Sequence, residues 1–214
     1  MDTILETADE ICYHESGHAV LGYLFGYRIE GIEVDPSEGS GCVSWDYESN
    51  VRPTVLELQN IPEIQARVIC HCGGYACVSV LTGAKQRWRN SEDYFNAEQE
   101  LAGYSDKKII AAHIRSNYAH ARNLLKKPQV RYAVQELASS LMWNCEEPNP
   151  EDCWYGEEMI DELPQEFWEG KSGLRKMKGK DAESIIRNAL QQYARTHNKD
   201  VWIVENNAWE LEDE

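Results

Sequence analysis

Two histidines stand four residues apart inside a run with helical spacing, and this pair limits how the chain can fold. The run reads His14-Glu15-Ser16-Gly17-His18. Thr7 and Glu10 precede it at the spacing of a capping box, in which each side chain accepts a hydrogen bond from the other residue's backbone. Gly26 follows and can end a helix. We therefore predict a helix from Thr7 to about Phe25.

The face of this helix that carries the histidines is predicted to be buried. On a wheel of about 100° per residue, several large apolar residues fall within about 60° of His14: Ile11, Leu21 and Phe25. Residues four apart on a helix lie one turn above each other, so both imidazole rings can reach one metal ion. Buried imidazoles need partners, and neutral imidazole nitrogens suit Zn²⁺. We therefore predict that His14 and His18 bind Zn²⁺.

A base and a third ligand are needed to complete a catalytic zinc site. Glu15 adjoins His14, so we expect its carboxylate beside the metal ion, where it can accept a proton from water whose pKa zinc lowers toward about 7. Acidic residues after the second predicted helix are candidates for the third ligand, and spacing does not choose among them: Glu92, Asp93, Glu98 and Glu100. His71 and His113 are expected instead to be internal histidines bonded to backbone.

The charge balance argues against nucleic acid and membranes as partners. The 214 residues include 21 Lys and Arg against 37 Asp and Glu, a net charge of −16. Nucleic-acid binding needs clustered basic residues that neutralise phosphates, and membrane-surface helices need a basic face. The N-terminus is acidic, and the longest apolar stretch, Ala19 to Tyr27, is far shorter than the roughly 20 residues that cross a bilayer. We expect a cytoplasmic protein.

Seven cysteines are spread along a chain long enough to fold without disulfides. Cys70 and Cys72 flank His71, and Cys77 follows. A structural zinc site usually needs a second pair of closely spaced cysteines, and the sequence has none. Most of the thiols are therefore expected to be reduced and buried in the core.

The remaining pattern predicts a mainly helical chain with a small β-sheet, an α+β fold. Alternating apolar residues predict two strands, at 28–35 and 43–47. Aliphatic residues at helical spacing predict further helices, at 62–81 with a bend at Gly73-Gly74, 91–104, 106–126, 128–144, 157–168 and from Asp181. The short connection at Lys127-Pro128 predicts that its two helices lie antiparallel. A short strand is predicted at 201–204.

Composition shifts near Gly170, and we divide the chain there. Residues 1–169 are predicted to form the main domain. Residues 170–180 concentrate five basic residues in an otherwise acidic chain and are predicted to be a solvated linker. Residues 181–214 are predicted to form a C-terminal helix, docked on the main domain, and an acidic tail.

The histidine run and several later motifs resemble one known family. Tyr13-His14-Glu15-Ser16-Gly17-His18-Ala19-Val20 is similar to the zinc helix of the FtsH protease domain, peptidase family M41, which reads H-E-x-G-H-A. Further similarities follow in the family's order: Ile32–Pro36 and Gly41–Trp45 to its edge strand, Gly73–Ala76 to G-G-R-A, Thr82–Ala84 to T-G-A, Asp93 with Ala97 to Asp-x-x-x-Ala, and Gly156–Met159 to a closing G-E-E-aliphatic helix. The resemblance spans Ala8 to Trp168.

This resemblance implies a zincin-like, M41-type helical domain. It implies that Asp93 joins His14 and His18 as a zinc ligand, that Glu15 is the general base, and that residues 43–47 form an edge strand onto which an extended peptide adds. Members of the family assemble into rings, so a homo-oligomer is a possible state of this chain.

The chain also departs from the family. Tyr75 stands where the family has Arg, and eight residues, 85–92, separate the T-G-A motif from Asp93. No phosphate-binding G-x4-G-K-S/T loop occurs, so the chain has no intrinsic ATPase.

These observations are compatible with three functions. The first is an ATP-independent zinc metallopeptidase that hydrolyses peptide bonds in unfolded or flexible polypeptides. The second is an inactive protease-like module that binds peptides, and the third is a helical interaction protein in which the motif is vestigial. Glu15 favours the first, because a module that only binds has no chemical need for a carboxylate at that position.

Overall fold

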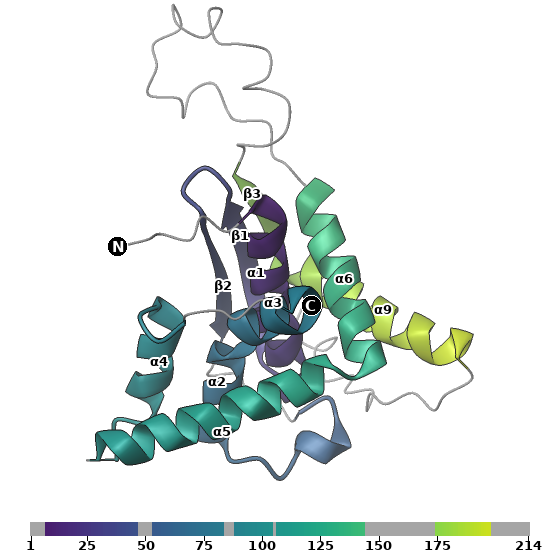
Figure 1. The fold of residues 1–214 in the computed structure, drawn as a ribbon. Coiled ribbons are helices and arrows are strands. Elements are labelled where there is room, and N and C mark those ends of the chain that lie inside the picture. Colours follow the sequence, from purple (N-terminus) through teal and green to yellow (C-terminus); the bar gives the residue numbers. More distant parts are fainter. Residues whose placement is uncertain (1–6, 47–52, 84–87, 105, 144–173, 198–214) are drawn as a thin grey trace, which may run out of the picture.

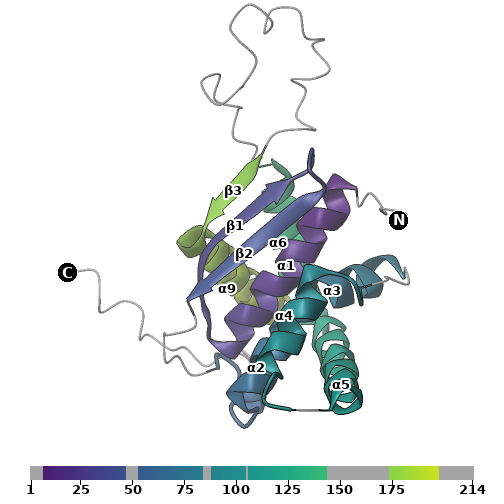
Figure 2. The ribbon, with the colours of Figure 1, turned by 90° about the vertical axis from the view of Figure 1, so that its left-hand side faces the viewer.

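The computed structural model describes residues 7–46, 53–83, 88–104, 106–143 and 174–197, and these form a mainly helical α+β fold (Figures 1 and 2). Helices surround one long helix, and a small antiparallel sheet lies along it. The α+β class is the predicted one. The helix predicted at 157–168, the strand predicted at 201–204 and the Gly156–Met159 motif lie outside the described residues.

The long helix α1, Ala8–Phe25, begins and ends where the sequence predicts. Thr7 and Glu10 form the capping box, with the Glu10 backbone N–H donating to Thr7 Oγ1 at 3.2 Å and the Thr7 N–H donating to Glu10 Oε2 at 3.1 Å. Gly26 ends the helix in the left-handed conformation, with φ 85°, which glycine adopts without steric strain. Almost every α1 residue from Ile11 onward is buried, so this helix forms the centre of the core.

The sheet has the order β2-β1-β3, with both pairings antiparallel. Strands β1, Arg28–Asp35, and β2, Ser40–Asp46, form a hairpin, and β3, Arg175–Lys178, pairs with the other side of β1. In β1 the inward residues Ile29, Ile32 and Val34 are buried. Strand β2 is therefore an edge strand among the described residues.

Strand β3 occupies part of the segment predicted to be a solvated linker. Arg175 and Met177 are buried and alternate with exposed lysines, so these four residues form a strand of the sheet and not a linker. The next helix, α9, Gly179–Thr196, starts two residues before the predicted cap at Asp181. A Cβ atom on Gly179 would lie 1.6 Å from the carbonyl oxygen of Ile29, so only glycine fits where α9 meets β1.

The other helices form two groups, and α2 (Glu63–His71), α3 (Gly73–Thr82), α6 (Pro128–Trp143) and α9 pack directly against α1. Helices α2 and α3 join at a 50° bend next to the predicted Gly-Gly break. A short 3₁₀ helix, Leu56–Leu58, precedes them, and α4, Glu92–Glu100, and α5, Lys107–Leu125, follow. Helix α5 lies against α2 and α3 (Figure 1).

The prediction that the helices on either side of Lys127-Pro128 lie antiparallel is wrong. Helix α6, Pro128–Trp143, turns away from α5 and packs against α1 and α9 (Figure 1). Its apolar residues, Val130, Ala133, Val134, Leu137 and Leu141, are buried there. The packing of α6 against α1 and α9, and not the short connection, thus accounts for its direction.

Of the five cysteines in the described residues, four are buried, as predicted, and Cys42 on β2 is exposed. Cys70, Cys72 and Cys77 are buried free thiols, and burial raises the pKa of each. Among the described residues, no single helix is long and apolar enough to span a membrane, although α2 and α3 would reach that length and apolarity if counted together across their bend.

Candidate metal centre

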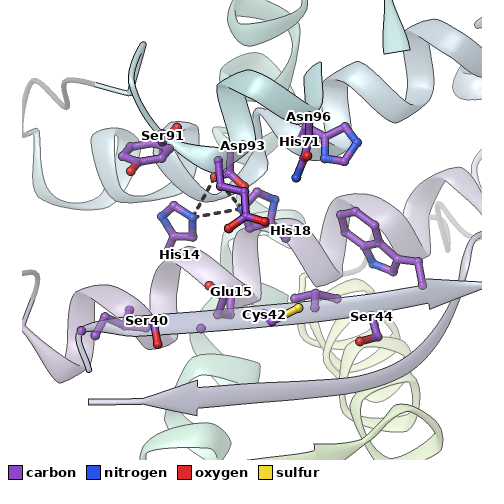
Figure 3. Close-up of a pocket in the computed structure, with 17 residues that line it drawn as sticks. His14, Glu15, His18, Ser40, Cys42, Ser44, His71, Ser91, Asp93 and Asn96 are labelled. Atoms are coloured by element: carbon purple, nitrogen blue, oxygen red, sulfur yellow. Dashed lines mark hydrogen bonds and ion pairs between the residues drawn. The ribbon is translucent and has the colours of Figure 1, made fainter. Parts of the chain in front are cut away.

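Three predicted ligand atoms converge on one point beside α1 (Figure 3). Nε2 of His14 and Nε2 of His18 lie 3.0 Å apart, and Oδ2 of Asp93 lies 3.0 Å from the first and 3.1 Å from the second. The histidines come from successive turns of α1, and Asp93 comes from the first turn of α4. Among the described residues these three form a group that could hold a metal ion.

The spacing of these atoms suits a divalent metal ion. In a tetrahedral site with bonds of about 2.0–2.1 Å, ligand atoms are separated by about 3.3 Å, so the observed separations need to widen by only about 0.3 Å. Two imidazole nitrogens and a carboxylate oxygen are ligands that zinc accepts.

The other acidic candidates are not part of this group. Glu92 is exposed and lines the neighbouring cavity, Glu98 is exposed on α4, and an oxygen of Glu100 lies 3.7 Å from Nε2 of His71. His71 also lines the cavity, and burial lowers its pKa to about 4. His113 lies elsewhere, with its ring against Tyr104 at 4.9 Å.

Charge and burial couple the three ligands. His14 and His18 are only 8 % and 4 % exposed. Burial alone would lower the pKa of His18, but the adjacent Asp93 carboxylate raises it to about 9. Burial alone would raise the pKa of Asp93, but the charge of His18 and the hydrogen bonds from both histidines hold it well below its usual range. The two histidines and Asp93 are thus electrostatically coupled.

Contacts behind the ligands fix their orientation. Nδ1–H of His18 donates to the carbonyl oxygen of Cys70 at 2.8 Å, which directs Nε2 toward Asp93. The ring of Tyr75 meets the ring of His14 edge to face at 4.7 Å. Ser91 caps α4, since the Tyr94 backbone N–H donates to its hydroxyl at 3.2 Å. This cap secures the helical turn that carries Asp93.

The Gly73-Gly74 pair is predicted from the sequence as a break in a helix and as a family motif, and the structure adds the reason why glycine is needed there. A Cβ atom on Gly74 would lie 2.3 Å from Nε2 of His14 and 2.5 Å from Nε2 of His18. On Gly73 it would lie 2.9 Å from the carbonyl oxygen of Gly17, where α3 crosses α1. The glycine pair at a predicted helix break was the one feature of the sequence that could have indicated this close approach of α3 to α1.

A cavity of about 670 Å³ opens over the ligand atoms. Strand β2 and the turn before it form one wall, from Gly39 to Trp45, and the N-terminal part of α4 forms the opposite wall (Figure 3). Glu15 also lines this cavity, is only 4 % exposed, and lies on the β2 side of α1 while the two histidines face Asp93 (Figure 3). The predicted base is therefore in the same cavity as the predicted ligands.

Neither a comparison with protein-family models nor a comparison with curated proteins finds a match to this chain. The similarity to the FtsH protease domain therefore depends on the short motifs quoted above.

Proposed function

We propose that this protein is a zinc metallopeptidase of the M41 type that hydrolyses peptide bonds in unfolded or flexible polypeptides without an ATPase of its own. The observation that carries the proposal is the convergence of His14, His18 and Asp93 within 3.1 Å beside Glu15, in a cavity walled by an edge strand.

The chain's own residues supply the ligands and the base in this proposal. His14, His18 and Asp93 would hold Zn²⁺, which when bound supplies a Lewis acid for the substrate carbonyl and lowers the pKa of water. Glu15 is not one of the ligands, and its buried carboxylate lines the cavity beside them. In this proposal Glu15 accepts the proton of the attacking water and passes it to the leaving amine.

Strand β2 supports an extended polypeptide as the substrate. Its outer edge has no strand partner among the described residues, and its residues form one wall of the cavity. An extended peptide can add to such an edge through main-chain hydrogen bonds, which brings a scissile bond past the metal ligands. Only a segment free of its own secondary structure can bind this way, which fits a substrate that is unfolded or flexible.

The test is cleavage of casein by zinc-loaded protein, with and without a chelator, beside the Glu15→Gln variant. We expect chelator-sensitive cleavage by the wild-type protein and a loss of about 10²–10⁴-fold in the variant at unchanged zinc content. Glutamine has the size of glutamate but cannot accept the proton. Equal cleavage by the variant and the wild type would contradict the proposal, and peptide binding without cleavage would favour the binding module.

A further inference from the structure

The inner face of β2 contacts α1 directly beside the proposed base. Gly41, Val43 and Trp45 alternate along β2 and so share one face of the strand. That face is turned to α1, because a Cβ atom on Gly22 of α1 would lie 2.8 Å from Nε1 of Trp45. Two α1 turns earlier, the residue that meets β2 is Glu15.

The side chain of Glu15 occupies the space that a residue other than glycine would need at position 41. A Cβ atom on Gly41 would lie 2.6 Å from Cγ, 2.6 Å from Oε1 and 2.8 Å from Cδ of Glu15. Non-bonded carbon atoms are normally about 3.5–4.0 Å apart, so a methyl group at position 41 would displace the carboxylate by about 1 Å. No backbone atom stands among these nearest neighbours, so the strand and the helix need not move.

We infer that Gly41 is the positioning residue for Glu15: the missing side chain on β2 sets where the proposed base stands in the cavity. This inference rests on the proposed function. The conformation of the backbone does not require glycine at this position, since Gly41 is not among the described glycines with positive φ. Contact with Glu15 is therefore the reason for glycine here.

The distinguishing property of Gly41 is that its replacement should spare the fold and the metal. Neither His14, His18 nor Asp93 lies among the nearest neighbours of the added Cβ atom. A displacement of about 1 Å in a catalytic group can reduce a rate by about 100-fold. We therefore expect Gly41→Ala to lower kcat about 100-fold, with unchanged zinc content and melting temperature.

Gly31→Ala is the matched control. It adds the same methyl group to the neighbouring strand β1, where the nearest atom, the carbonyl oxygen of Met177, would be 3.5 Å away in ordinary van der Waals contact. This variant should keep the wild-type kcat. A second comparison uses Glu15→Asp, whose side chain is one methylene shorter and retreats from β2, so Gly41→Ala should cost less in that background than in the wild type.

These measurements distinguish a positioning role of Gly41 from a role in substrate binding or in folding. A rise in KM with unchanged kcat would mean that the methyl group obstructs substrate binding along β2, and it would overturn the inference. An equal loss in the wild-type and Glu15→Asp backgrounds, or a loss of zinc or of the folded state, would also overturn it.

A readout without activity keeps this test independent of the proposed function. In a crystal structure of zinc-loaded Gly41→Ala, the Glu15 carboxylate should be displaced by about 1 Å from its wild-type position, and an unmoved carboxylate would refute the inference. Absence of cleavage by the wild-type protein would instead refute the peptidase proposal, and the crystallographic comparison would still decide the role of Gly41.

Discussion

Replacing Gly74 by alanine should remove the metal while leaving the fold in place. The new Cβ atom would lie 2.3 Å from Nε2 of His14 and 2.5 Å from Nε2 of His18, so at least one ring must move by about 1 Å to restore normal contact distances. Metal sites tolerate deviations of about 0.2 Å in their bonds, so a shift of this size is several times too large. We expect zinc affinity to fall by about 100-fold or more.

The metal-free protein should respond differently to Gly74→Ala. Gly74 lies inside α3, where alanine is intrinsically more favourable than glycine by about 1 kcal/mol, and without metal the ring of His14 can shift at the cost of its hydrogen bond to Asp93. The free energy of unfolding should therefore change by no more than about 1 kcal/mol. Zinc affinity is measured by competition with a chromophoric chelator, and stability by thermal unfolding in excess chelator. Wild-type zinc affinity in Gly74→Ala would refute the reasoning about this close approach.

Three further perturbations test other parts of the structure. Asp93→Ala should lower zinc occupancy by about 10-fold or more in elemental analysis, whereas Glu92→Ala, one residue away and outside the ligand group, should not, and equal occupancies would exclude Asp93 as a ligand. Burial lowers the pKa of His71 from 6.5 to about 4, so this residue stabilises the fold above pH 6.5 and loses that contribution, about 3 kcal/mol, as pH falls toward 4. Denaturant unfolding of wild type and His71→Gln across this range should show the smaller acid sensitivity in the variant, and parallel pH profiles would contradict the buried neutral histidine. Gly179→Ala should destabilise the protein by about 2 kcal/mol or more, because its Cβ atom would meet the Ile29 carbonyl oxygen at 1.6 Å, and an unchanged melting temperature would contradict the close contact of α9 with β1.

Local signals were enough to predict the helix that carries the site. The capping box at Thr7, the left-handed Gly26 and the histidine spacing are all properties of neighbouring residues, and the structure confirms the helix that they predict. The hairpin of β1 and β2 was predictable for the same reason, from apolar residues that alternate along a short stretch of sequence, although β2 begins at Ser40, three residues before the strand predicted at 43–47. Spacing along the chain did not single out Asp93, because α4 comes close to the histidines only in the folded chain. The family resemblance named Asp93, and in the structure its carboxylate lies beside both histidines.

Tertiary contacts explain what the sequence left out. Strand β3 contains Arg175, which is buried although an arginine is normally expected to lie in solvent. The alternation of buried and exposed residues that marks this strand therefore cannot be recognised in the sequence. The roles of Gly41 and Gly74 depend on side chains that reach them from α1, and no local pattern reveals such an approach. The direction of α6 likewise depends on the apolar surface of α1 and α9 rather than on the length of its connection to α5.

The metal content of the purified protein tests the central claim most directly. After incubation with zinc and removal of the excess, mass spectrometry of the metal should give one zinc ion per chain, and a variant with both His14→Ala and His18→Ala should retain none. A wild-type protein that takes up no transition metal, or a double variant that holds as much as the wild type, would contradict the account.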